Sequence, residues 1–150
     1  MRIEKHAEQL KKELSNYCVA IDIAGSLRRK VPNARDIDYI CIPIDKEKLI
    51  EYLKKKYPVY RAGKKLVSFE VMGIFIDLFF ADKINYGAML LFLTGTKGSN
   101  IGMRVIAKKK GFKLNQYGLW RGKELIASET EEDIYKALGR SFKLPELRGK

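Results

Sequence analysis

The amino-acid sequence predicts an α+β protein with a small C-terminal lobe that begins near Thr94. Two observations predict this class: stretches with apolar residues at helical spacing alternate with runs rich in β-branched and aromatic residues. With 150 residues, of which 46% are hydrophobic, the chain can bury a core without disulfides or structural metal. We therefore expect a folded globular protein.

The N-terminal part is expected to form one helix and two strands. Apolar residues recur at helical spacing between Ile3 and Leu14, which predicts an amphipathic helix over residues 2–15. The segments 17–24 and 36–42 are rich in β-branched and aromatic residues, which is typical of strands. The polar loop between them is short, so the two strands should pair antiparallel.

The middle of the chain is expected to contain a helix and then a group of strands. Asp45 can cap a helix that runs to about Lys56, where three lysines suit the negative end of the helix dipole. Residues 58–80 predict strands that are punctuated by Gly63 and Gly73.

Two further helices are expected next. Asp82 is a candidate cap for a helix over residues 83–93, which the glycine-containing stretch after it ends. A second helix over residues 100–110 should stop at Gly111.

The C-terminal part should contain short strands joined by glycine turns, followed by a helix over residues 131–138 with Thr130 as its cap. We expect one subdomain over residues 1–93 and a second, C-terminal subdomain over residues 94–150. No internal repeat or low-complexity linker interrupts the chain.

The charge of the chain favours a polyanionic partner. It has 30 Lys and Arg against 18 Asp and Glu, a formal net charge of +12, which points to nucleic acid or nucleotides. No apolar run approaches the ~20 residues of a membrane span, and the N-terminus has no apolar signal core. We therefore expect a soluble cytoplasmic protein without a membrane partner.

The two cysteines and the single histidine are too few for a structural zinc site. Cys18 and Cys41 fall on the two paired strands, and we expect them within about a residue of register. A cross-strand disulfide is conceivable, but two reduced thiols are favoured.

Three aspartates are candidates for a metal site. Residues i and i+2 of a strand point to the same face, so Asp36 and Asp38 should project together while Ile37 points to the core. Asp77 lies in the next strongly apolar strand, where a charge is costly unless it faces a site. Three acids from two strands suit a pair of Mg²⁺ or Mn²⁺ ions, which can assist in-line phosphoryl displacement.

The loop upstream of these acids carries candidate phosphate ligands. Gly25 allows close approach of the backbone, Ser26 offers a hydroxyl, and Arg28 or Arg29 can grip phosphate oxygens. A surface ion-pair loop is the alternative. In that case Ser26 shapes the turn, Arg28 pairs with a structural acid, and Asp22 is a nearby acid without a role in the site.

Further motifs follow in a fixed order. "GSLRR" is followed by "DID", by "FIDLFF" and then by "LFLTGTKGSNIGMRVIAKKKGFKLNQYGLW". The first three resemble the nucleotidyltransferase-fold palm of the family X DNA polymerases, and the last resembles the C-terminal segment of that family. The likeness is greatest to compact viral members. It implies a nucleotidyltransferase-type catalytic palm with a mixed sheet over residues 1–93, a nucleotide- and template-binding subdomain over residues 94–150, and no lyase or helix-hairpin-helix domains.

The resemblance implies roles for the acids and the upstream loop. Asp36 and Asp38 would bind both metals, and Asp77 would complete the catalytic metal site and help take the proton from a primer 3′-hydroxyl. The incoming triphosphate would be held by Gly25, Ser26 and Arg29.

The resemblance also implies roles in the C-terminal segment. Phe92 to Gly95, with Leu93 between them, would pack along the nucleotide sugar, although Phe92 and Leu93 also fit the core face of a helix. Asn100 would reach the minor-groove edge of the incoming base, and Arg104 the template strand. Further DNA phosphate contacts would come from Lys108, Lys109, Lys110 and Lys113.

One loop departs from the family pattern. Ala34 and Arg35 stand where the family often places small donors to the triphosphate. Arg35 is therefore a candidate replacement ligand for a phosphate.

We thus expect a template-directed DNA polymerase that transfers nucleotides from dNTPs to a primer 3′-hydroxyl, filling short gaps in DNA repair as a monomer on primer-template or gapped DNA. Two Mg²⁺ ions are the expected cofactors, with Mn²⁺ as a substitute. The alternatives are a template-independent nucleotidyltransferase acting on RNA, protein or a small molecule, and a non-catalytic nucleic-acid-binding module. The three acids argue against the last, because a binding module gains nothing obvious from buried carboxylates.

Overall fold

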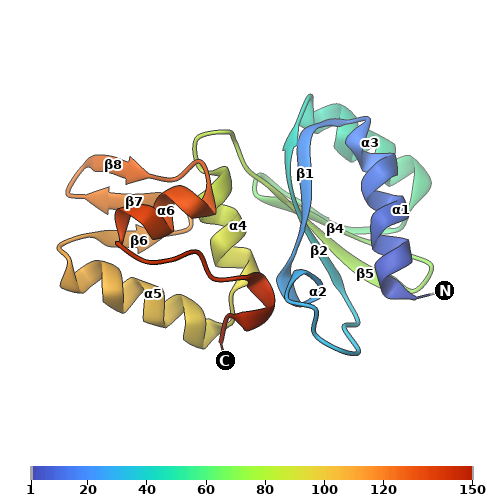
Figure 1. Ribbon diagram of the computed structural model, residues 1–150. Coiled ribbons are helices and arrows are strands. Elements are labelled where there is room, and N and C mark those ends of the chain that lie inside the picture. Colours follow the sequence, from blue (N-terminus) through green and yellow to red (C-terminus); the bar gives the residue numbers. More distant parts are fainter. Residues whose placement is uncertain (1, 150) are drawn as a thin grey trace. The chain divides into compact units, whose positions relative to one another are not determined.

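The computed structural model describes residues 2–149 and consists of two compact units that are divided between Ala81 and Asp82 (Figure 1). Each unit has its own hydrophobic core. The expected α+β class with a mixed sheet is confirmed.

The first unit is built on a five-stranded sheet with the strand order β1-β2-β5-β4-β3. Strands β2 and β5 are parallel, and the other neighbours are antiparallel. The elements are α1 (Ile3–Ser15), β1 (Cys18–Ala24), α2 (Gly25–Arg28), β2 (Ile37–Pro43), α3 (Lys46–Lys56), β3 (Val59–Ala62), β4 (Leu66–Val71) and β5 (Ile74–Phe80).

Helices α1 and α3 cover one face of this sheet. Leu14 of α1 and Leu53 of α3 are fully buried in the same cluster as Tyr39 of β2. The hydroxyl of Tyr39 donates a hydrogen bond of 2.8 Å to the carbonyl oxygen of Ala7 on α1. Because side chains alternate along a strand, Asp38 next to Tyr39 lies on the opposite face.

Most elements of the first unit agree with the sequence predictions. Strands β1 and β2 pair antiparallel, and the Asp45 carboxylate accepts a hydrogen bond of 3.2 Å from the Lys48 backbone N–H, as expected for a helix cap. Cys18 and Cys41 are buried free thiols. The expected register was wrong, because Cys18 lies opposite Pro43, next to an irregularity in the pairing of the two strands.

The second unit packs helices against a three-stranded antiparallel sheet with the order β6-β7-β8. Its core includes Leu91, Met103, Leu119 and Ile134. The elements are α4 (Tyr86–Thr94), α5 (Lys97–Lys109), β6 (Lys113–Asn115), β7 (Gly118–Arg121), β8 (Glu124–Ala127), α6 (Glu131–Ala137) and a 3₁₀ turn η1 (Pro145–Leu147).

Two helix starts in this unit differ from the predictions. Asp82 does not cap α4: its carboxylate accepts from the Asn85 N–H while the Asn85 side chain accepts from the Asp82 N–H, which closes a local turn before the helix. Helix α5 begins at Lys97 and not at Asn100, because Thr96 caps it by accepting from the Ser99 N–H. The cap at Thr130 is confirmed by a bond of 3.1 Å from the Asp133 N–H.

The boundary between the units lies earlier than the expected division after residue 93. Helix α4 belongs to the second unit, because Ala88 and Leu91 are buried in its core. The N–H of Ala88 also donates a hydrogen bond of 2.9 Å to the carbonyl oxygen of Ser128.

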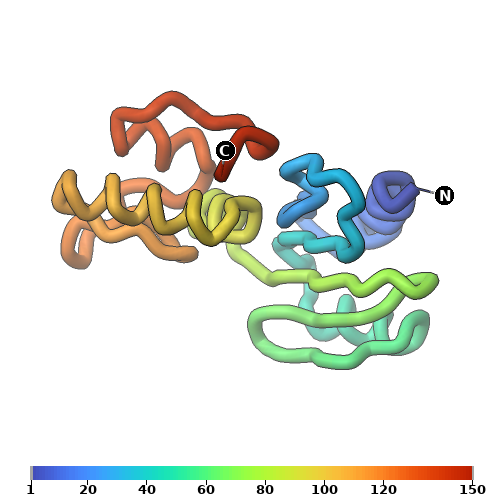
Figure 2. The backbone as a smooth tube through the Cα atoms, turned by 90° about the horizontal axis from the view of Figure 1, so that it is seen from below, coloured from blue at the N-terminus to red at the C-terminus, as the bar shows by residue number. Residues whose placement is uncertain are grey.

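The C-terminal segment returns to the start of α5, where Gly149 lies against Thr96 (Figure 2). A buried ion pair of 2.7 Å between Arg148 and Glu131 of α6 holds this segment, and the Arg148 guanidinium also lies against the Tyr135 and Phe142 rings. Within residues 2–149, no helix has both the length and the apolar character needed to cross a membrane.

Candidate active site

Backbone register brings two of the predicted acids side by side. Asp38 of β2 is the parallel register partner of Asp77 of β5, and Ala24 at the end of β1 lies opposite Asp38. On the other side of Asp77, Ser68 of β4 is the direct partner. We call Asp38, Asp77 and Ser68 the acidic row; all three project from the sheet face opposite α1 and α3.

The electrostatics of Asp38 show that the predicted acids act on one another. Burial and the negative charges of Asp77 and Asp36 raise the pKa of Asp38 to about 6. The positive charge of Arg29 acts in the opposite direction. The charges of the other two acids and of one predicted arginine thus act on Asp38.

The donor set of this region fits divalent metal ions. Carboxylate oxygens are the ligands that Mg²⁺ and Mn²⁺ prefer, and a dication would relieve the repulsion that acts on Asp38. Asp36 lies exposed in the loop before β2, next to the acidic row. Among residues 2–149, the side chains as placed form no ready-made group of three His, Cys, Asp or Glu metal ligands.

The short helix α2 follows β1 directly and packs against Asp38. Gly25 has a φ of +64°, and a Cβ at this position would collide with the Asp38 carboxylate. A glycine is therefore required both by the backbone conformation and by the close approach. Leu27 is buried, which anchors the turn, while Ser26 and Arg29 remain partly exposed beside the acidic row.

Sequence reasoning missed Ser68. Its hydroxyl donates a hydrogen bond of 2.6 Å to Oδ1 of Asp77. A single serine within an apolar strand gives no signal of such a role, because the register of the two strands is needed to find its partner.

A second group of predicted residues meets in the second unit. Phe92, Asn100 and Arg104 line a small pocket, which we call the Asn100 pocket. Nδ2 of Asn100 donates a hydrogen bond of 2.9 Å to the carbonyl oxygen of Phe92. Leu93 and Gly95 do not line this pocket, but a Cβ on Gly95 would collide with Oδ1 of Asn100. The remaining lining residues are Ala88, Leu91, Leu114, Asn115 and Gln116.

Helix α5 presents a polar face that leads away from this pocket. Asn100, Arg104 and Lys108 are spaced four residues apart and so share one face of the helix. The other predicted DNA-contacting lysines, Lys109, Lys110 and Lys113, are exposed, and so is Arg35 in the first unit.

Asn115, like Ser68, was not predicted from the sequence to have a role. Its Oδ1 accepts hydrogen bonds from the backbone N–H groups of Tyr117 and Gly118 at 2.9 and 3.1 Å and from Nε1 of Trp120 at 3.3 Å. It therefore fixes the turn between β6 and β7 at the wall of the Asn100 pocket.

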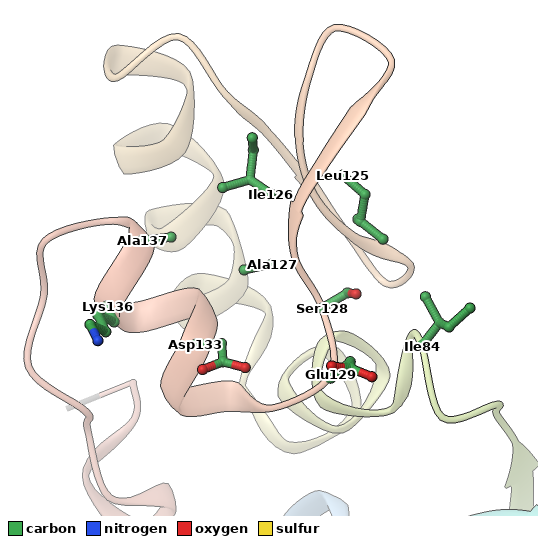
Figure 3. A pocket seen from close by; sticks show the side chains of 9 residues that line it. All are labelled: Ile84, Leu125, Ile126, Ala127, Ser128, Glu129, Asp133, Lys136 and Ala137. Atoms are coloured by element: carbon green, nitrogen blue, oxygen red, sulfur yellow. The ribbon is translucent and has the colours of Figure 1, made fainter.

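A larger groove of about 600 Å³ lies elsewhere in the second unit. Residues of β8, such as Leu125, and of α6, such as Asp133, line it together with Ile84 (Figure 3). It contains none of the residues predicted to bind nucleotide or DNA.

The chain is similar to several known proteins. Residues 89–149 match the DNA polymerase beta thumb family. The chain is 33% identical to the repair DNA polymerase X of African swine fever virus (isolate Warthog/Namibia/Wart80/1980), over 93% of this chain and 86% of the viral protein. It is 29% identical to the DNA polymerase/3'-5' exonuclease PolX of Bacillus subtilis, over 97% of this chain and 26% of the bacterial protein.

Proposed function

Since the chain belongs to the family X DNA polymerases, we propose that it is a template-directed enzyme that fills short gaps during DNA repair. In the structure, this proposal rests on the direct register of Asp38 and Asp77, with the charge of Asp36 acting on Asp38 as well. Such a cluster of anions is suited to nucleotidyl transfer and is of no evident use to a purely structural sheet.

The proposed reaction joins the primer 3′-oxygen to the α-phosphorus of a dNTP. The bond between that phosphorus and the bridging oxygen breaks, pyrophosphate leaves, and the proton of the 3′-hydroxyl passes to Asp77 acting as general base. Asp36, Asp38 and Asp77 would hold two Mg²⁺ ions, or Mn²⁺ in their place. Bound there, the ions would supply Lewis-acid stabilisation of charge on the phosphoryl oxygens.

The α2 turn is the proposed triphosphate site. Gly25 brings backbone close to Asp38, Ser26 offers a hydroxyl, and Arg29 offers a guanidinium with planar donor geometry. Arg35 is proposed as a further phosphate ligand, since it lies exposed in the loop just before Asp36.

The Asn100 pocket is the proposed site for the nascent base pair. Phe92, Leu93 and Gly95 would pack along the sugar, Asn100 would bind the minor-groove edge of the incoming base, and Arg104 would contact the template. DNA phosphates would be bound by Lys108, Lys109, Lys110 and Lys113, in keeping with the net charge of +12.

We further propose that the first unit is a nucleotidyltransferase-type palm and that the second unit binds the nucleotide and template. The match of residues 89–149 to a polymerase thumb supports the second part of this proposal. The enzyme would act as a monomer on gapped or primer-template DNA.

The decisive experiment compares the wild type with Asp77→Ala on one-nucleotide-gapped DNA, with Mg²⁺ and each dNTP supplied separately. The wild type is expected to insert the complementary nucleotide, and the variant to lose at least about 1,000-fold in rate because a proposed base and metal ligand is gone. Equal incorporation by both proteins would remove Asp77 from the mechanism. Insertion that ignores the template base would instead show a template-independent transferase.

A further inference from the structure

A two-residue turn places Ser68 beside Asp77. Met72 and Gly73 join β4 to β5 with φ values of +51° and +82°, the backbone of a tight hairpin turn. From this turn the antiparallel register runs back to the pair Ser68 and Asp77. The two side chains therefore project from the same face of the sheet.

The contact between them is a short hydrogen bond to a carboxylate. The Ser68 hydroxyl donates to Oδ1 of Asp77 at 2.6 Å, within the range of charge-assisted O–H···O⁻ bonds. It engages one of the two oxygens and so restrains the plane of the carboxylate. Both side chains are partly buried, which limits competition from water.

The other neighbours of Asp77 on this face cannot replace that donor. Phe75 and Phe79, two positions before and after it on β5, are apolar, and Asp38 on β2 is an acid. Among these four side chains fixed by strand and register, Ser68 is therefore the one with a hydroxyl to offer. Asp77 thus has an anion on one side and a hydrogen-bond donor on the other.

We propose that Ser68 is a positioning residue of the nucleotidyl-transfer site, whose hydroxyl orients the Asp77 carboxylate toward the metal ions and the primer 3′-hydroxyl. This inference rests on the proposed function. Ser68 itself touches neither the nucleotide nor the primer in this role. It acts through Asp77, so its loss should slow the chemical step more than it weakens dNTP binding.

The test uses Ser68→Thr and Ser68→Val, a matched pair of β-branched side chains of nearly equal shape that differ in the hydroxyl. In the one-nucleotide gap assay, Ser68→Val is expected to lower kcat by about tenfold or more, the magnitude typical of a lost hydrogen bond to a charged group. KM for the dNTP should change by less than about threefold. Ser68→Thr should retain most of the rate because it keeps the donor.

Binding of Mn²⁺ to the protein without DNA, followed by electron paramagnetic resonance, supplies a readout that does not depend on turnover. Ser68→Val is expected to weaken this binding by about tenfold relative to Ser68→Thr, as for partners that orient metal ligands. If Ser68→Val fails to fold, Ser68→Ala takes its place and should show the same losses. Equal kcat and equal Mn²⁺ affinity in the variants with and without the hydroxyl would overturn the proposal.

The failure of this inference can be separated from the failure of the proposed function. A wild type that inserts no nucleotide contradicts the function itself. A wild type that is active, with an inactive Asp77→Ala and indistinguishable Thr and Val variants at position 68, contradicts the role of Ser68 alone.

Discussion

The acidic row of the first unit and the Asn100 pocket of the second unit hold their polar side chains in different ways. In the acidic row, strand register forces Asp38 and Asp77 together, and the pKa of Asp38 is raised by burial and by like charge. In the Asn100 pocket, hydrogen bonds to the main chain fix the amides: Asn100 donates to the Phe92 carbonyl, and Asn115 accepts from two backbone N–H groups.

This difference fits the roles proposed for the two regions, namely catalysis and base-pair recognition. A site that binds cations and moves a proton benefits from carboxylates whose charge is not yet neutralised, at some cost in stability. A site that reads a base pair benefits from side chains already held in one geometry, because less conformational freedom is lost on binding. The acidic row should therefore lower the free energy of unfolding, whereas the Asn100 pocket should not.

Replacing Asp38 by Asn tests most directly whether the acidic row supports activity at a cost in stability. Activity is expected to fall by at least about 1,000-fold, because a proposed metal ligand is lost. The free energy of unfolding in metal-free buffer is expected to rise at neutral pH, by on the order of 1 kcal/mol, because a partly buried charge near Asp77 and Asp36 is removed. Chemical denaturation and gap filling measure the two effects.

Asp45→Asn is the matched control within the same unit. Asn caps a helix about as well as Asp, so both the activity and the stability should remain close to those of the wild type. If Asp38→Asn were less stable than the wild type in metal-free buffer, repulsion between the carboxylates would not destabilise the fold.

Local signals in the sequence predicted more of the fold than of the candidate site. The caps at Asp45 and Thr130 were predictable because each depends on a few adjacent residues. The partnership of Ser68 with Asp77 was not, because it depends on a turn in which Met72, a residue that rarely adopts positive φ, takes the place of the usual Asn or Asp. The reciprocal hydrogen bonds between Asp82 and Asn85, which replace the predicted cap at Asp82, were likewise not predictable without the position of Asn85.

Arg104→Ala tests the recognition side of the comparison. Since Arg104 lines the Asn100 pocket, templated insertion is expected to slow by about tenfold and to lose base selectivity, while dNTP binding and stability are retained. Single-turnover kinetics with correct and incorrect dNTPs measure these effects.

Lys5→Ala is the control for Arg104→Ala. It removes one positive charge from the exposed surface of α1 without touching the Asn100 pocket. Loss of dNTP binding alone in Arg104→Ala would place this arginine with the triphosphate ligands and contradict a contact to the template.

Glu13 contrasts with Asp38 within the first unit, because its pKa is lowered and that of Asp38 is raised. Its replacement is expected to have the smallest of the effects on stability. Burial opposes ionisation of Glu13, but hydrogen bonds from the Tyr52 and Tyr57 hydroxyls and from Lys56 outweigh it and lower its pKa. A carboxylate with a lowered pKa stabilises the fold above its unfolded pKa of about 4.5, and this contribution is lost as the pH falls through the folded pKa.

Glu13→Gln is therefore expected to lower the free energy of unfolding at pH 7 by about 1 kcal/mol or less, since the site is partly solvated. The difference from the wild type should shrink as the pH falls below 4, and Glu51→Gln, an exposed change on α3, is the control. A loss that stayed constant at low pH would mean that the shape of Glu13 matters and its charge does not.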